Sequence, residues 1–240
     1  MEENLLLDKE HWAEYWKNYI YESVPDNHLL DDYLPEDVKN KTAIEIGGFP
    51  GFLSVYSHKK GFREVSFIDF YIDSDIIKKL EAKNNISNVI KYIQADFLKY
   101  EPQEEYDFVY SFGFAEHFED TKDIIQRHIK YAKIGGKIVI IMPNFLGING
   151  WIQRIFDRDN FKIHNLKSMD YKNLNLILNE LSVSNFSISY YKKPMIWLEP
   201  KKSSLNLLVR KIVKLFSLSL KLIPFRNKFL SSYVIISITK

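Results

Sequence analysis

A glycine-rich turn between two short apolar runs constrains the fold of this chain more than any other feature. Residues 43–51 read AIEIGGFPG, an apolar run carrying the acid Glu45 and followed by glycines. A second apolar run over 65–68 ends in Asp69. Parallel α/β folds hold nucleosides in this way, because glycines let the backbone approach the ligand and the acid accepts hydrogen bonds from ribose hydroxyls. The segment therefore predicts a nucleoside site.

The spacing of the glycines excludes two common nucleotide sites. The dinucleotide fingerprint requires the pattern G-x-G-x-x-G, and neither Gly47 nor Gly48 as first glycine satisfies it. The turn also lacks the lysine of a P-loop. The pattern that fits is Glu45 followed by Gly47 and Gly51.

Strand-like and helix-like patterns alternate along the middle of the chain. The expected strands are 42–46, 65–69, 89–94, 106–111 and 137–142, and the expected helices are 52–60, 75–83 and 121–132. Such alternation predicts βαβ units and a parallel sheet, with all strand C-termini on one rim where ligands bind. We expect Glu45 and Asp107 to join Asp69 and Asp96 in an acidic rim there.

The flanking segments are less regular. Aromatic residues at helical spacing predict an amphipathic helix over 8–21. We further expect a linker or one short helix over 25–40, an irregular stretch over 145–171, a helix over 173–181, a strand over 186–191, an amphipathic helix over 203–223 and a last strand over 233–238. These features divide the chain into a cap helix and linker (1–40), an α/β core (41–145) and a substrate-side segment of the same domain (146–240).

Five segments, in order and at matching spacing over about residues 40–145, resemble class I S-adenosylmethionine-dependent methyltransferases of the small-molecule branch. Residues 45–51 are similar to the first motif of that family, and Asp69 to the acid that ends its second strand. Residues 94–97 (QADF), 106–118 and 134–144 are similar to the third-strand motif, the fourth-strand segment, and the glycine turn with the fifth strand. One position departs from the pattern: Phe49 stands where the family usually has glycine. Because Pro50 pushes Phe49 toward an extended conformation, we expect a stiff, crowded loop.

The resemblance implies a doubly wound, mostly parallel α/β sheet of seven strands, with an N-terminal cap helix and a C-terminal amphipathic extension. It implies S-adenosylmethionine as cofactor, with Asp69 on the ribose hydroxyls, Asp96 on the adenine amino group and Phe97 against the adenine ring. The expected cofactor contacts are Glu45, Gly47, Gly48, Phe49, Gly51, Asp69, Phe70, Asp96, Phe97, Ser111 and Phe112. A non-catalytic protein that keeps this fold is the alternative from a different class.

Motifs and residues that the sequence lacks exclude several classes of methyl acceptor. Adenine and glutamine amino-group methyltransferases carry Asn/Asp-Pro-Pro-aromatic after the fourth strand, where this chain reads SFGF over 111–114. Cytosine C5 methylation needs a cysteine, and the sequence has none. No catechol-type set of metal ligands is evident. We therefore expect metal-independent transfer to a small-molecule hydroxyl, with His117 as the first candidate general base and His164 as the second.

The charge distribution indicates an anionic partner for the C-terminal quarter. Residues 190–240 carry 11 Lys/Arg and one acid, Glu199, whereas residues 1–189 carry 22 Lys/Arg and 30 acids. A sugar, phosphorylated or lipid-linked as in surface-polysaccharide pathways, suits such a tail. The alternative acceptor is a quinone or other lipid precursor, methylated on carbon or oxygen. Nucleic acid is disfavoured, because lysines alternate with leucines there without an aromatic stacking platform.

The same segment bears on location. Residues 205–223 contain four Lys/Arg, each costing about 2.5–3.5 kcal/mol near a bilayer centre, so they do not predict a membrane span. Peripheral contact with a membrane surface through 203–223 and packing as a cap helix on the domain both remain open. The absence of cysteine and of a signal-peptide pattern at the N-terminus is typical of a cytoplasmic protein.

Overall fold

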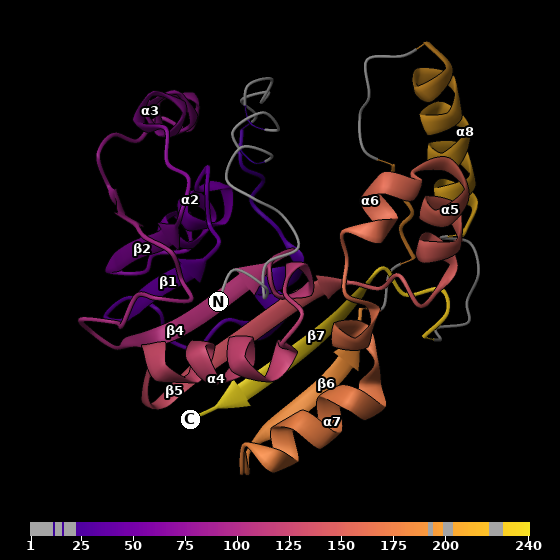
Figure 1. Cartoon of the computed structure of the whole chain (residues 1–240). Coiled ribbons are helices and arrows are strands. Elements are labelled where there is room, and N and C mark those ends of the chain that lie inside the picture. The colour runs from indigo at the N-terminus through magenta and orange to yellow at the C-terminus, as the bar shows by residue number, and fades with distance from the viewer. Residues whose placement is uncertain (1–11, 13–15, 17–22, 192–193, 199–203, 221–227) are drawn as a thin grey trace.

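The computed structural model describes residues 12, 16, 23–191, 194–198, 204–220 and 228–240. Its centre is a seven-stranded sheet in the order β3-β2-β1-β4-β5-β7-β6 (Figure 1). The strands are β1 (Thr42–Ile46), β2 (Glu64–Asp69), β3 (Ile90–Gln94), β4 (Tyr106–Phe112), β5 (Ala132–Pro143), β6 (Phe186–Tyr190) and β7 (Tyr233–Thr239). Strands β1 to β5 pair in parallel, and β7 runs antiparallel to both of its neighbours. The predicted doubly wound α/β sheet of seven strands is confirmed.

Helices cover both faces of this sheet. One face carries α2 (Phe52–Lys59), α3 (Ser74–Lys83) and the short 3-10 helix η1 (Leu29–Tyr33), and the other carries α4 (Thr121–Tyr131) and α7 (Tyr171–Glu180). Strand β1 shows how the sequence specifies two faces, since successive side chains point to opposite sides. Ala43 belongs to the first apolar layer, whereas Ile44 and Ile46 belong to the second.

The prediction of an irregular stretch over 145–171 is wrong. This stretch contains α5 (Ile148–Phe156), α6 (Arg158–Lys162) and the 3-10 helix η3 (Leu166–Met169). Gly150 is a poor helix former, so the sequence of α5 did not indicate a helix. It is nevertheless required there, because a Cβ at this position would lie 1.8 Å from the carbonyl oxygen of Phe145.

The last helix, α8 (Ser204–Leu220), packs on the rest of the chain through only some of its residues. Val213, Ser217 and Leu220 are buried, whereas the apolar residues Ile212 and Phe216 are exposed. The hydroxyl oxygen of Ser217 accepts a hydrogen bond from the backbone N–H of Ile196 (2.9 Å). Residues 221–223 of the predicted helix lie outside the described residues. In Figure 1, α8 stands beside α5 and α6, beyond the end of the sheet.

The strand register brings the segments that follow β1 to β4 to one edge. Ile46 pairs with Ile68 on β2 and with Ser111 on β4, and Asp69 pairs with Gln94 on β3. One edge of the sheet therefore holds the glycine turn, Asp69, Asp96 and the segment after β4. The predicted helix over 8–21 falls mainly outside the described residues. Of its members, Trp12 and Trp16 are described, and both are helical.

Candidate active site

The glycine turn connects β1 to α2 through two residues in the left-handed region. Gly47 has a φ of +67° and Gly51, the N-cap of α2, a φ of +98°. The N–H of Gly47 donates to the carbonyl of Ile68 (2.9 Å), and the N–H of Gly51 donates to that of Gly48 (2.6 Å). L-residues with a side chain rarely adopt this conformation, so the two glycines that match the sequence motif are required by the backbone itself.

Asp69 lies at the end of β2, directly beside this turn. Its Oδ1 accepts a hydrogen bond from the N–H of Tyr71 (3.0 Å) and its Oδ2 one from the N–H of Phe49 (3.2 Å). Burial raises the pKa of Asp69 to about 6, against backbone hydrogen bonds that act to lower it. Phe49 is buried, and its ring packs edge-on against Tyr71 and Trp16, with centroid distances of 5.2 and 5.4 Å. The loop is thus crowded by aromatic rings.

Glu45 does not contribute a charge to the rim. Its carboxylate is buried and accepts a hydrogen bond from the hydroxyl of Ser54 on α2 (2.7 Å). Burial raises the pKa of Glu45 to about 8, so this group is mostly protonated at neutral pH. Asp107 lies at the opposite edge, near the start of β4, where it bonds the N–H of Thr42 (2.9 Å) and the ammonium of Lys133 (2.8 Å). The expected rim of four acids is therefore reduced to Asp69 and Asp96.

The other expected cofactor contacts divide between the rim and the core. Asp96 is half-buried, and its Oδ1 accepts a hydrogen bond from the N–H of Leu98 (2.9 Å). Phe97 is buried against Phe114, Tyr131 and His128. Phe70 and Phe112 are half-buried, whereas the hydroxyl of Ser111 is fully buried and bonds Nε2 of His128 (3.0 Å). Any contact that Ser111 makes with a ligand would therefore involve its backbone.

Phe114, which the sequence reasoning overlooked, lies directly on the glycine turn. A Cβ at Gly47 would lie 2.1 Å from Cδ2 of Phe114. The same ring packs against Phe97 and Phe118, with centroid distances of 5.4 and 4.8 Å. The aromatic residue after Gly113 was visible in the sequence, but its position over Gly47 depends on the turn at the end of β4.

The two candidate bases lie together. The ring centroids of His117, in the 3-10 helix η2 (Ala115–His117), and of His164 are 4.7 Å apart. The Nδ1 of His117 bonds the carbonyl of Ile163 (3.1 Å), and the Nδ1 of His164 bonds that of Asn160 (2.6 Å). Burial lowers the pKa of His164 to about 4. The structure thus brings together two residues that are distant in the sequence, with His117 in the segment that follows β4.

Glu116 completes this cluster. It is buried, burial raises its pKa to about 8, and one of its carboxylate oxygens lies within 4.8 Å of a ring nitrogen of each histidine. The backbone N–H of Asn165 donates to the carbonyl of Glu116 (2.7 Å), and the side chain of Asn165 bonds the carbonyl of Phe118 (2.9 Å). Asn165 therefore holds the segment with His164 against η2. The adjacent residues Glu116 and His117 could have been noticed in the sequence, whereas the proximity of His164 to them could not.

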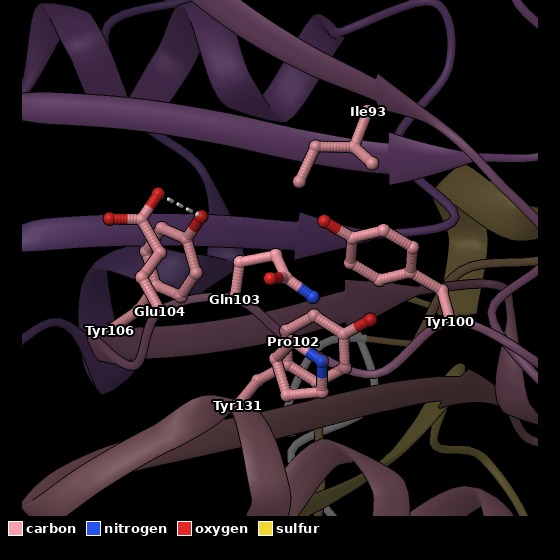
Figure 2. A pocket seen from close by; sticks show the side chains of 7 residues that line it. All are labelled: Ile93, Tyr100, Pro102, Gln103, Glu104, Tyr106 and Tyr131. Carbon is pink, nitrogen blue, oxygen red and sulfur yellow. Dashed lines mark hydrogen bonds between the residues drawn. The ribbon is translucent and has the colours of Figure 1, made fainter.

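A shallow pocket lies elsewhere on the molecule. Figure 2 shows its lining, Ile93, Tyr100, Pro102, Gln103, Glu104, Tyr106 and Tyr131, around a space of about 210 Å³ that includes open solvent. The hydroxyl of Tyr106 donates to Glu104 (2.8 Å). No residue of the glycine turn or of the Glu116 cluster lines this pocket, so it is separate from the candidate active site.

The fold and the acidic, glycine-lined rim define a class of enzyme. The sequence profile of the methyltransferase domain family matches residues 15–181, and the chain belongs to this family. It is a class I S-adenosylmethionine-dependent methyltransferase, as the resemblance of its motifs implied.

Individual relatives are more distant. The chain is 27% identical over 157 residues, 57% of its length and 78% of the relative's, to a Methanocaldococcus jannaschii protein provisionally named protein N5-glutamine methyltransferase. A solved methyltransferase of Archaeoglobus fulgidus is 20% identical, with a TM-score of 0.54 over 88% of this chain and 91% of that one. The geranyl diphosphate C-methyltransferase of Streptomyces coelicolor is 15% identical, with a TM-score of 0.61 over 96% and 97% of the two chains. These two structures share the fold.

The residues at the rim fit S-adenosylmethionine. Asp69 and Asp96 follow neighbouring strands, and the turn beside them presents backbone without side chains at Gly47 and Gly51. Carboxylates suit the ribose hydroxyls, the adenine amino group and the positive charge of this cofactor. Asp69 would hold the ribose and Asp96 the adenine amino group, whereas Phe97 is packed in the core.

The pKa of Asp69 predicts a pH dependence of cofactor binding. Ribose hydroxyls donate to the ionised carboxylate, so affinity should be full above pH 6 and fall as the pH drops below 6. One coupled proton limits the fall to about tenfold per pH unit. Isothermal titration of S-adenosylhomocysteine between pH 5 and 8 measures this dependence. A flat profile in the wild type, or a matching slope in Asp69→Asn, would contradict it.

Proposed function

We propose that this methyltransferase transfers the methyl group of S-adenosylmethionine to a hydroxyl of a small molecule, a sugar or a related surface-polysaccharide precursor. The observation that carries the proposal is the pairing of His117, in the segment after β4, with His164. Since backbone carbonyls only accept hydrogen bonds, each Nδ1 bonded to one carries the proton and each Nε2 the lone pair. The site thus presents basic nitrogens suited to accept a hydroxyl proton.

The two histidines have different roles in this proposal. The low pKa of His164 keeps its imidazole neutral but makes it a weak base. His117, the better base candidate, takes the hydroxyl proton, and His164 positions it through the contact between their rings. The cofactor supplies an already activated methyl group. The protein has to hold the acceptor oxygen in line at about 3–3.5 Å and exclude water, and the buried surroundings of His117 favour such exclusion.

The amide acceptor suggested by the name of the archaeal relative fits this chain poorly. Residues 111–114 place Phe114 after β4, and its ring packs on Gly47 and against Phe97 and Phe118. An amide group needs polar partners for its N–H and C=O groups, and Phe114 offers none. We therefore favour a hydroxyl over a glutamine side chain.

A transfer assay tests the acceptor class. The purified protein is incubated with S-adenosylmethionine carrying a labelled methyl group and with separated sugar-phosphate, lipid and protein fractions. We expect label in the sugar-phosphate or lipid-linked sugar fraction, in a methyl ether that survives mild alkali. Labelled methylamine released by acid hydrolysis of the protein fraction would instead indicate a glutamine acceptor and overturn the proposal. Retained binding of S-adenosylhomocysteine confirms that the preparation is folded.

A second candidate, a quinone or other lipid precursor methylated on carbon or oxygen, is favoured by the surface of α8. Its exposed residues include Leu207, Leu208, Ile212, Leu215, Phe216 and Leu218, interleaved with Lys211 and Lys214. Trp151 and Phe156 of neighbouring α5 are also exposed. Apolar and basic residues on one helix are typical of contact with an anionic membrane surface. Within the described ranges, no helix is long and apolar enough to cross a bilayer.

This surface predicts binding to anionic vesicles. The wild type should sediment with phosphatidylcholine vesicles that contain phosphatidylserine and, more weakly, with phosphatidylcholine alone. The double variant Ile212→Glu, Leu215→Glu should lose at least about 100-fold in partitioning, because the two aliphatic side chains together contribute about 3–6 kcal/mol when buried. Leu176→Glu, which alters an equally exposed leucine on α7, is the matched control. Equal partitioning of both variants would contradict membrane contact through α8.

A further inference from the structure

The cluster of Glu116, His117 and His164 has the composition of a metal site. Each residue offers a ligand atom, and these atoms all lie within 4.8 Å of one another. Two imidazoles and one carboxylate are the three protein ligands of many catalytic zinc sites, which keep a further position open. Ligand atoms approach zinc to about 2.0–2.2 Å, so a modest inward movement of the three side chains closes the set on an ion.

The hydrogen bonds around the histidines are those of metal ligands. A ligating histidine usually donates its other ring N–H to a carbonyl or carboxylate, which fixes the tautomer and orients the ring. The Nδ1 atoms of His117 and His164 donate to the carbonyls of Ile163 and Asn160. Both rings therefore have their lone pair on Nε2. The ring of Phe145 packs on His164, with a centroid distance of 4.6 Å, and restricts its orientation further.

The carboxylate of Glu116 supplies an independent reason. Its Oε2 is buried and has no hydrogen-bond partner within the described chain. A buried carboxylate without a partner is costly unless it is neutralised or coordinates a cation. Among the described residues, no lysine or arginine forms an ion pair with Glu116, so the carboxyl group is neutralised either by a proton or by a bound cation. The histidines beside it make a metal ion the fitting occupant.

We propose that Glu116, His117 and His164 bind one divalent transition-metal ion, for which Zn²⁺ is the probe, with a coordination position open toward the methyl acceptor. A Cβ built on Gly113 would lie 3.6 Å from Oε1 of Glu116, and the ring of the next residue, Phe114, lies over Gly47. We therefore place the open position on the side of the cofactor turn. The sequence-based expectation of metal-independent transfer considered ligands near the fourth strand, and His164 belongs to the segment between α6 and η3.

The role of the ion rests on the proposed hydroxyl acceptor. A divalent cation lowers the pKa of a bound hydroxyl, so the acceptor would release its proton to solvent as it binds, before water is excluded for the methyl transfer. The oxygen then forms the new bond to the methyl carbon, and the electrons of the broken carbon–sulfur bond remain on sulfur. In this form of the mechanism, His117 is a ligand of the metal ion and helps to orient the acceptor. The ion, rather than His117, then activates the hydroxyl.

Metal titration of the full-length, chelator-treated protein tests the site. We expect one Zn²⁺ per chain, a rise in melting temperature on adding Zn²⁺, and visible absorption bands of low-symmetry cobalt when Co²⁺ is used instead. Glu116→Gln preserves the shape of the side chain but removes a charged ligand. Loss of a hydrogen bond that supports a metal ligand costs about 10–100-fold in metal affinity, so loss of the ligand itself should weaken Zn²⁺ binding by more than that. His164→Ala should do the same. His58→Ala, which removes a histidine of α2, should bind as the wild type does.

Three outcomes would overturn the metal site: Zn²⁺ binding no tighter than in a His58→Ala, Glu116→Gln double variant, equal affinity in the wild type and Glu116→Gln, or methyl transfer that a chelator leaves unchanged. Titration with S-adenosylhomocysteine in the same samples separates this failure from failure of the proposed function. A protein that binds the cofactor and transfers methyl groups equally well with and without chelator keeps its function and loses the metal site. Loss of cofactor binding in Glu116→Gln would show that the variant is damaged, and His164→Ala then decides.

Discussion

Replacing Asp69 with alanine is expected to weaken binding of S-adenosylmethionine about 100-fold or more. Hydrogen bonds to a charged group contribute about 1.5–3 kcal/mol each, and we propose that the carboxylate at the end of β2 accepts them from two ribose hydroxyls. Asp69→Ala also removes the acceptor for the N–H groups of Phe49 and Tyr71. A loss of about 1–3 kcal/mol in the free energy of unfolding should therefore accompany the loss of affinity. Calorimetric titration and chemical denaturation measure the two effects.

The control for this experiment is another aspartate on the same side of the molecule. Asp75, in the first turn of α3, is exposed and forms a long ion pair with Lys78 (3.9 Å). Asp75→Ala should change neither the affinity nor the stability by more than a few tenths of a kcal/mol. Asp69→Asn keeps the shape and should retain most of the stability while losing affinity. If Asp69→Ala bound the cofactor as tightly as Asp75→Ala does, the ribose assignment would be wrong.

Gly47→Ala should impair both cofactor binding and stability. The added Cβ would lie 2.1 Å from Cδ2 of Phe114, and the φ of +67° is unfavourable for any residue with a side chain. The conformational cost is about 1–2 kcal/mol, and displacement of the Phe114 ring adds to it. We expect a large fall in affinity for S-adenosylhomocysteine, because the displaced ring and turn border the cofactor site.

Gly61→Ala separates these two causes. Gly61 has a φ of +96°, and nothing lies within 4 Å of a Cβ built there. This variant should show the conformational cost and normal cofactor affinity. The double variant Gly47→Ala, Phe114→Ala should recover part of the stability that Gly47→Ala loses, because the overlap is gone. Additive effects in the double variant would show that Phe114 does not exclude a side chain at Gly47.

Most of the sheet could be predicted from the sequence because local signals specify it. Strand β1 has the predicted bounds, because its apolar run ends at a turn whose backbone requires positive φ angles, which glycine adopts readily. Asp69 was predicted at the end of β2 because an apolar run ends there in an acid. Helix α5 was missed because Gly150 serves packing rather than helix formation. The sequence also left open how 203–223 packs, because a polar residue, Ser217, is buried there and bonds the N–H of Ile196.

Features that depend on tertiary contacts could not be predicted. The neutral state of Glu45 follows from its burial beside Ser54. Asp107 differs, because the predicted strand over 106–111 already places it at the start of β4, away from the rim. The meeting of His117 with His164 depends on Asn165, which bonds η2 from a segment far along the chain. No periodicity or motif spacing encodes these contacts.

The two described tryptophans of the N-terminal segment give this enzyme an intrinsic optical reporter. Trp16 packs on Phe49, whose N–H is bonded to Asp69, and Trp12 packs on His117, with a centroid distance of 5.3 Å. Each indole therefore touches a different half of the site. Emission from Trp16 should follow the cofactor and emission from Trp12 the acceptor, so single-tryptophan variants would resolve the order in which the two substrates bind.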